Sequence, residues 1–320
     1  MLLKRALLTI AVLLVGLGGV FLMGPRVEVN TDIEPEAVPQ DVQGWVDGGE
    51  AAIPDLRPGA EKQIVWFNPS LKEKTNLSVV YLHGFSATRQ EIAPVCDRLA
   101  TQLGANLYYA RLTGHGRDGA DMAEGSVKAW LEDAEEAYQV GRLLGERVVV
   151  VGTSTGATLA TWLASEHSDL AAMVFVSPNF GLADPASVLL TGPWGLQLAT
   201  LILGEERSWE PANPGQEMYW STRYPTRALL PMMGLVDLVD DIDLSQIKIP
   251  TLIFYSTEDG VVDPKRIEAR FETLGSGRKA LVPVDTTGLP SAHVLTGDIM
   301  APAKTDQVVS RSVAFIRGSR

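Results

Sequence analysis

One stretch of the sequence, residues 147–164, constrains the fold more than any other, and it reads RVVVVGTSTGATLATWLA. Four consecutive valines without alternation predict a strand buried on both faces, as in a parallel sheet. The GTSTG at 152–156 matches the G-x-S-x-G turn that joins a strand to a helix and exposes a nucleophile, Ser154. Glycine is needed on both sides because a larger side chain would collide with the neighbouring strand or helix. The alternative is a glycine-rich turn that has no chemical role or cradles a phosphate.

Further apolar segments alternate along the chain with helical patterns and short loops. Strands are expected at 62–67, 77–82, 105–112, 171–176, 250–255 and 280–284, and helices include 89–103 and 304–316. This alternation predicts an α/β fold with a mostly parallel sheet and helices on both faces. Functional side chains in such sheets lie at the carboxyl ends of the strands.

Two later residues suit a serine nucleophile. Asp259 follows the strand expected at 250–255, and His293 lies in the loop after the last expected strand. Their order after Ser154 is the order Ser, Asp, His of one known type of catalytic triad. Glu258 is the weaker alternative for the acid, while Asp263 precedes Pro264 and is expected to cap a helix. The sequence therefore predicts Ser154, Asp259 and His293 as the catalytic residues.

Backbone amides are the expected donors to an oxyanion. The loop His83-Gly84-Phe85 follows a strand, and glycine lets the chain approach a substrate closely. We predict the amides of Phe85 and Thr155 as the oxyanion hole. His83 and His115 are expected to be structural, with His83 buried and hydrogen-bonded in the oxyanion loop.

The alternation breaks between residues 179 and 248, a stretch too long for a plain loop. It contains three tryptophans, Trp194, Trp209 and Trp220. We predict a mostly helical lid over Ser154, which would form an apolar pocket suited to an acyl chain. Alternatively, these aromatic side chains form only the core of the lid itself.

The amino terminus differs from the rest of the chain. Lys4 and Arg5 precede an apolar run from Ala6 to Met23, which is about the length needed to span a bilayer. We predict a membrane anchor or signal segment at 1–24 and a Pro- and acid-rich spacer at 25–60. The positive-inside rule then places the domain at 61–320 on the outer side of the membrane, and the alternative is secretion after signal cleavage.

The composition narrows the possible partners. The chain of 320 residues has 27 basic and 39 acidic residues, so its net charge is 27 − 39 = −12, which argues against nucleic acid. The single cysteine, Cys96, allows no intrachain disulfide, and the four histidines have no metal-site spacing. We therefore expect neither a metal nor a cofactor, and the oligomeric state stays open.

Five motifs in order resemble the α/β-hydrolase superfamily, namely HGF at 83–85, TGHG at 113–116, GTSTG at 152–156, TED at 257–259 and SAHV at 291–294. Within it, residues 60–318 look like the branch of monoglyceride lipases and carboxylesterases, which overlaps the serine aminopeptidase group S33. One departure is threonine on both sides of Ser154, where lipase relatives often carry another residue before the serine and methionine after it.

The resemblance implies an α/β-hydrolase fold with a lid and an enzyme that needs no cofactor. We expect a serine hydrolase that cleaves acyl esters through an acyl-enzyme intermediate, with a small ester or lipid-like substrate. The first alternative is an S33-type aminopeptidase, in which an acid of the lid would bind the substrate amine; the candidates are Glu205, Glu206, Glu210, Glu217 and Asp237. The second is a membrane-tethered binding module without catalytic activity.

Overall fold

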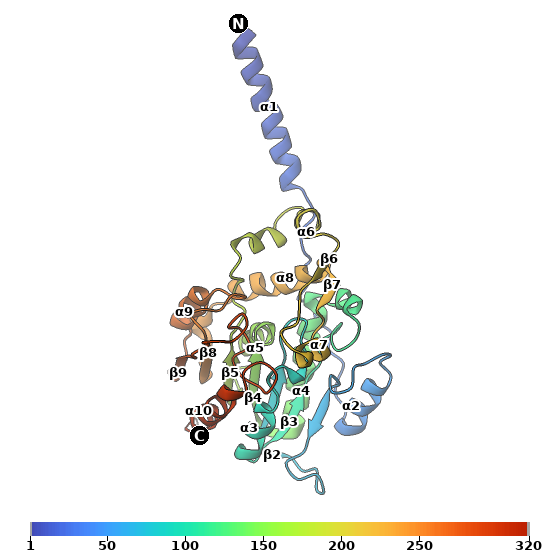
Figure 1. The fold of residues 1–320 in the computed structure, drawn as a ribbon, viewed down its shortest axis with the longest axis vertical. Coiled ribbons are helices and arrows are strands. Elements are labelled where there is room, and N and C mark those ends of the chain that lie inside the picture. Colours follow the sequence, from blue (N-terminus) through green and yellow to red (C-terminus); the bar gives the residue numbers. More distant parts are fainter. Residues whose placement is uncertain (1, 319–320) are drawn as a thin grey trace.

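The computed structural model describes the backbone of residues 2–318 and their side chains, except those of residues 2, 3, 6 and 10–12. Within this part of the chain, seven strands form one central sheet in the order β1-β3-β2-β4-β5-β8-β9 (Figure 1). Their bounds are β1 Gln63–Val65, β2 Thr75–Leu82, β3 Asn106–Tyr109, β4 Gly145–Thr153, β5 Ala172–Val176, β8 Thr251–Tyr255 and β9 Lys279–Pro283. Only the pairing of β1 with β3 is antiparallel among these strands, so the predicted mostly parallel sheet is confirmed.

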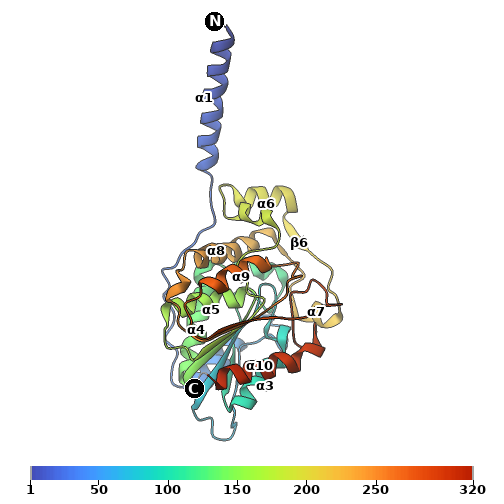
Figure 2. The same cartoon turned by 90° about the vertical axis from the view of Figure 1, so that its left-hand side faces the viewer.

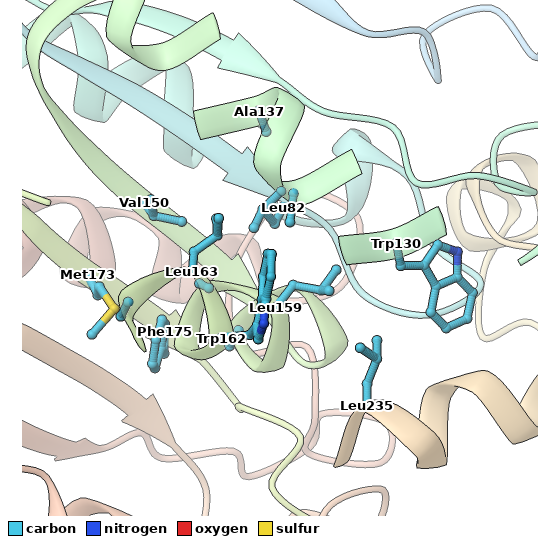
Figure 3. Packing of buried hydrophobic residues seen from close by; sticks show 14 of the residues in the cluster. Leu82, Trp130, Ala137, Val150, Leu159, Trp162, Leu163, Met173, Phe175 and Leu235 are labelled. Atoms are coloured by element: carbon cyan, nitrogen blue, oxygen red, sulfur yellow. The ribbon is translucent and has the colours of Figure 1, made fainter. Parts of the chain in front are cut away.

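Helices cover both faces of the sheet (Figure 2). One face is covered by α4 Val127–Leu144, α5 Thr155–Glu166 and α9 Pro264–Thr273, and the other by α3 Val95–Leu103 and α10 Thr305–Arg317. Helix α8, Leu229–Asp240, packs on α4 and α5. The valines of β4 alternate between the two cores, with Val148 and Val150 in one and Val149 and Val151 in the other. Figure 3 shows the first core, where α5 lies against the sheet. Burial on both faces explains the unbroken valine run.

The helix predicted at 89–103 is interrupted in the structure. A 3₁₀ turn, η1, spans Arg89–Ile92, and α3 begins only at Val95. Pro94 lies between them, and proline lacks an N–H and disfavours helical geometry in the residue before it. The apolar spacing was right, but the single continuous helix was wrong.

The stretch predicted as a spacer, 25–60, belongs in part to the folded domain. Helix α2, Val42–Ala51, buries Val42 and Val46 against the core. Its last turn carries Glu50, which accepts two hydrogen bonds of 2.8 Å from the guanidinium of Arg111, and both side chains are buried. This bidentate ion pair ties the segment to the start of the TGHG loop.

The lid at 179–248 is mostly helical, as predicted. It contains η3 Pro185–Leu190, α6 Gly195–Leu203, α7 Pro214–Tyr219, η4 Thr226–Ala228, α8 and η5 Leu244–Gln246. Besides η1, the 3₁₀ turns outside the lid are η2 Gly119–Glu124 and η6 Pro302–Lys304. A short hairpin of β6 Glu206–Ser208 and β7 Arg223–Pro225 was not predicted, because three-residue strands leave no periodic pattern.

The predicted membrane anchor at 1–24 is not supported. Residues Leu2–Leu22 form helix α1, which projects from the body of the molecule (Figure 1). No helix in the described part of the chain has the length and apolar character needed to cross a bilayer. Residue 1 and the side chains of 2, 3, 6 and 10–12 lie outside the described residues, as do residues 319–320 at the other end.

Candidate active site

Ser154 lies in the sharp turn between β4 and α5, with φ +51° and ψ −116°. Such a positive φ is strained for a residue other than glycine. The amide of Ser154 donates to Val176 O at 3.0 Å, and its carbonyl accepts from the Asn179 amide at 3.1 Å. Neighbouring segments therefore hold the strained backbone in place.

The two glycines of the GTSTG turn are required by close backbone contacts. A Cβ on Gly156 would lie 1.9 Å from Leu82 O, and one on Gly152 would lie 2.7 Å from Ala157 N. Both distances are far below van der Waals contact, so any larger residue would displace the main chain. The steric reason predicted for this motif is present in the structure.

The predicted acid and base form a pair. Nδ1 of His293 lies 2.8 Å from Oδ2 of Asp259, whose side chain is completely buried. The other oxygen of Asp259 accepts from the amides of Val261 and Val262 at 2.8 and 3.0 Å. Three donors thus fix this carboxylate, and it can hold His293 with the proton on Nδ1 and the lone pair on Nε2.

Ser154 and His293 line the same cavity, which has a volume of about 450 Å³. The loop that carries the histidine is tied to the sheet, since the hydroxyl of Ser177 donates to His293 O at 2.7 Å. Among the described residues, no hydrogen bond joins Ser154 Oγ to the His293 ring. In free enzymes such a bond is often long and tightens when substrate binds.

Both amides predicted for the oxyanion hole are available. In the described part of the chain, neither the Phe85 nor the Thr155 amide donates to a protein acceptor. Thr155 is the first residue of α5, so the helix dipole adds positive potential at this position. Phe85 follows β2, which is hydrogen-bonded to β4 and therefore ends at the same edge of the sheet.

His83 and His115 are completely buried, and neither lines the cavity at Ser154. Nδ1 of His83 donates to Gly84 O, and its Nε2 accepts from the Leu112 amide. Nε2 of His115 accepts from the Ser86 amide at 3.0 Å. Burial lowers the pKa of His83 to about 4 and that of His115 well below its usual value, so both rings are neutral. His83 is buried and hydrogen-bonded in the loop after β2, as predicted, and His115 also holds this loop through Ser86.

The cavity at Ser154 adjoins an apolar chamber beneath the lid, with a volume of about 380 Å³. The two share lining residues, which are Phe85, Leu182, Arg207, Tyr224, Met232 and Val261. Leu189, Leu190, Leu198 and Ile202 make most of the chamber aliphatic. Trp209 and Trp220 line the serine cavity, whereas Trp194 packs at the foot of α1 and donates to Phe21 O. The chamber is thus mostly aliphatic, and the aromatic side chains of the lid lie mainly at the serine cavity.

Sequence reasoning missed Glu91. This carboxyl is only 2% exposed and accepts a hydrogen bond from the Gly84 amide at 2.5 Å. Burial raises its pKa to about 7, although the hydrogen bonds from Gly84 and Tyr81 and the charge of His293 lower it. A glutamate at the start of an expected amphipathic helix gives no sequence signal of burial.

A protein-family model described as serine aminopeptidase, S33, matches residues 73–287 of the chain. The chain belongs to this family. The family is a branch of the α/β-hydrolases, as the five motifs indicated. In the described residues of this S33 hydrolase, no cluster of three or more His, Cys, Asp or Glu side chains could hold a metal ion.

Relatives of this S33 hydrolase agree with the fold. The thermostable monoacylglycerol lipase of Bacillus sp. (strain H-257) is 29% identical over 248 residues, which cover 77% of this chain and 93% of that lipase. A structure from work on the metagenome-derived lipolytic enzymes LipS and LipT has a TM-score of 0.68 at 23% identity, covering 82% and 99% of the two chains. The monoacylglycerol lipase of Paleococcus ferrophilus has a TM-score of 0.59 at 15% identity, covering 81% and 98%.

Proposed function

We propose that this protein is a serine esterase that cleaves carboxylic esters of an acyl chain, as a carboxylesterase or monoacylglycerol lipase does. The main support is the hydrogen bond between Asp259 and His293 beside a cavity that Ser154 also lines. The adjoining aliphatic chamber suits an acyl chain, and the polar lining residues Arg207 and Gln216 suit the alcohol part. The similarity to a monoacylglycerol lipase supports the same substrate class.

In the proposed mechanism, Nε2 of His293 takes the proton of Ser154 Oγ as this oxygen attacks the ester carbonyl. The resulting oxyanion accepts hydrogen bonds from the Phe85 and Thr155 amides, each contributing roughly 3–4 kcal/mol. Asp259 fixes the tautomer of the ring and stabilises the imidazolium. The protonated ring then gives its proton to the departing alcohol, and water activated by the neutral ring hydrolyses the acyl-enzyme.

The direct test is the variant Ser154→Ala. We expect it to lose at least about 10⁴-fold in kcat/KM for p-nitrophenyl butyrate and all labelling by a fluorophosphonate probe. Its circular dichroism spectrum should match that of the wild type. Retained turnover in a folded Ser154→Ala protein would refute the assignment, and a wild-type protein that neither turns over nor labels would support the non-catalytic binding module.

An aminopeptidase is the second candidate, because the matching family model carries that name. Of the acids predicted as an amine clamp, Glu210 lines the cavity at Ser154 in the described structure. A comparison of an aminoacyl p-nitroanilide with a p-nitrophenyl acyl ester decides between the two activities. We expect the ester to be preferred, and a preference for the anilide that disappears in Glu210→Gln would favour the aminopeptidase.

We further propose an extracytoplasmic location, reached by secretion after cleavage of a signal segment at 1–24. The support is the pair Lys4 and Arg5 before an apolar run, and the position of α1 outside the body of the molecule (Figure 2). Fractionation of cells that express the full chain tests this proposal. Recovery of activity from the cytoplasm alone would contradict it.

A further inference from the structure

Glu91 is a buried carboxyl that the proposed reaction does not use directly. Its Oε1 accepts from the Gly84 amide at 2.5 Å and lies 2.8 Å from the hydroxyl of Tyr81. Burying a carboxyl costs free energy that hydrogen bonds offset only in part. Glu91 lies next to the oxyanion loop, so its hydrogen bonds can hold that loop in place.

The hydrogen bonds continue from Glu91 to the nucleophile strand. The Tyr81 hydroxyl lies 3.0 Å from Oγ1 of Thr153, and both side chains are completely buried. A tyrosine hydroxyl carries one proton. When that proton is donated to Glu91, the hydroxyl of Thr153 must donate to Tyr81. The chain of bonds therefore runs from the Gly84 amide through Glu91 and Tyr81 to Thr153.

The two ends of this series of hydrogen bonds lie next to the two donors of the oxyanion hole. Gly84 immediately precedes Phe85, and Thr153 lies two residues before Thr155. The amides come from separate segments, one after β2 and the other after β4, so their separation depends on what connects these segments. Donors must keep their positions to within about 0.5 Å to stabilise a transition state.

Gly84 also packs closely between Glu91 and the nucleophile. A Cβ on Gly84 would lie 3.0 Å from Oε2 of Glu91 and 3.3 Å from Cβ of Ser154. A shift of the Glu91 carboxylate would therefore move the loop relative to the serine.

From this geometry we propose that Glu91 is a positioning residue that, with Tyr81 and Thr153, fixes the Phe85 amide relative to the Thr155 amide. The inference rests on the proposed esterase function. It assigns the carboxylate a part in the rate of acyl transfer, although the side chain does not touch the substrate.

The first test compares Glu91→Gln with Glu91→Leu. The amide oxygen of glutamine can still accept from Gly84 and Tyr81, whereas leucine of similar size cannot. We expect Glu91→Leu to lower kcat for p-nitrophenyl butyrate about 30-fold with KM nearly unchanged, because a misplaced oxyanion donor costs up to about 10²–10³ in rate. Glu91→Gln should retain kcat to within about threefold of the wild type.

The second test uses two matched tyrosines. Tyr109 is also buried on a neighbouring strand, and its hydroxyl donates to Asp97 at 2.6 Å, away from the oxyanion loop. Tyr81→Phe and Tyr109→Phe each remove the hydroxyl that is hydrogen-bonded to a carboxylate. Both substitutions should therefore lower the melting temperature. We expect only Tyr81→Phe to lower kcat, by about fivefold. This pair decides the question if Glu91→Leu does not fold.

A merely structural role for Glu91 would lower the melting temperature of the variants without changing kcat per folded molecule. The proposal is therefore overturned if folded Glu91→Leu keeps wild-type kcat, if Glu91→Gln is as slow as Glu91→Leu, or if the two tyrosine variants have the same kcat. Failure of the esterase function would instead appear in the wild type, as absent turnover and absent fluorophosphonate labelling.

Discussion

The carboxyl edge of the sheet and the lid are built in opposite ways. At the sheet edge, Ser154, Asp259 and His293 are all more than nine-tenths buried. The backbones of Ser154 and His293 are hydrogen-bonded to neighbouring segments. The lid at 179–248 consists of short elements and exposes apolar side chains such as Leu201 and Ile202. This difference supports the proposal that the sheet edge carries the reaction, while the lid selects which substrate reaches it. Changes at the edge should therefore affect turnover or folding, and changes in the lid should affect selectivity.

After Ser154→Ala, the largest effect is expected from Asp259→Asn. The asparagine oxygen can still accept from Val261 and Val262, but its NH₂ then faces Nδ1 of His293 and favours the wrong tautomer of the ring. We expect kcat/KM for a short ester to fall about 10³–10⁴-fold. Asp263→Asn is the matched control, because asparagine caps the start of α9 as well as aspartate does. A similar loss in both variants would contradict the assigned role of Asp259.

The next largest effect is on the stability of the fold at the carboxyl edge of the sheet. Gly156→Ala places a methyl group 1.9 Å from Leu82 O, so β2 and α5 must move apart. We expect the free energy of unfolding in urea to fall by about 3 kcal/mol or more. Gly48→Ala in α2, where the new methyl group meets no atom within 4 Å, should instead raise it by up to about 1 kcal/mol. Equal effects of the two substitutions would refute the steric requirement for glycine at 156.

Stability should also depend on pH through Glu91. Its pKa rises from 4.5 to about 7 on folding, so the folded state binds the proton more tightly. This contribution is fully present below about pH 4.5 and is lost as pH rises through about 7, a change of roughly 3 kcal/mol. We expect urea unfolding to show that loss in the wild type relative to Glu91→Gln, which has no proton to release.

The wild type must be compared with Glu91→Gln because other buried groups also make stability depend on pH. Asp133, with a pKa raised to about 6 by burial, acts in the same direction, and His83, with its pKa lowered to about 4, acts in the opposite direction. Because both are present in the two proteins, the difference between the wild type and Glu91→Gln isolates Glu91. An identical pH dependence in the two proteins would show that Glu91 titrates normally.

The smallest effect is expected in the lid. Leu198→Trp fills part of the aliphatic chamber, so we expect kcat/KM to fall about tenfold for octanoate and longer esters and to change little for acetate. A series of p-nitrophenyl esters measures this. Leu201→Trp on the exposed side of the same helix is the control, since Leu201 is 81% exposed and does not line the chamber. A uniform loss for all esters would place the acyl chain elsewhere.

The sheet was predicted well from the sequence because the residue patterns that indicate it are local. The valine run, the glycines around Ser154 and the acid after β8 each follow from contacts within a few residues or from burial on both faces. Asp259 and His293 were predicted as partners from chain order, and the structure brings them into a hydrogen bond. Their assignment to catalysis stays a prediction, as does that of the Phe85 and Thr155 amides.

Other features depend on contacts between distant segments. The burial of Glu91 depends on Tyr81 and Gly84 from another strand and loop, and no periodic pattern records it. The hairpin of β6 and β7 is too short to be predicted from alternation. The predicted spacer was read from its prolines and acids, which concealed the two buried valines of α2.

The ion pair between Glu50 and Arg111 has a practical consequence for where the enzyme can be shortened. A protein that started at residue 61 would keep every proposed catalytic group but leave the guanidinium of Arg111 inside the molecule without its counter-charge. Losing one member of a buried pair costs about 3–5 kcal/mol, which is a large share of the stability of a typical domain. The smallest independently folding catalytic unit should therefore begin before residue 42, well upstream of the first strand.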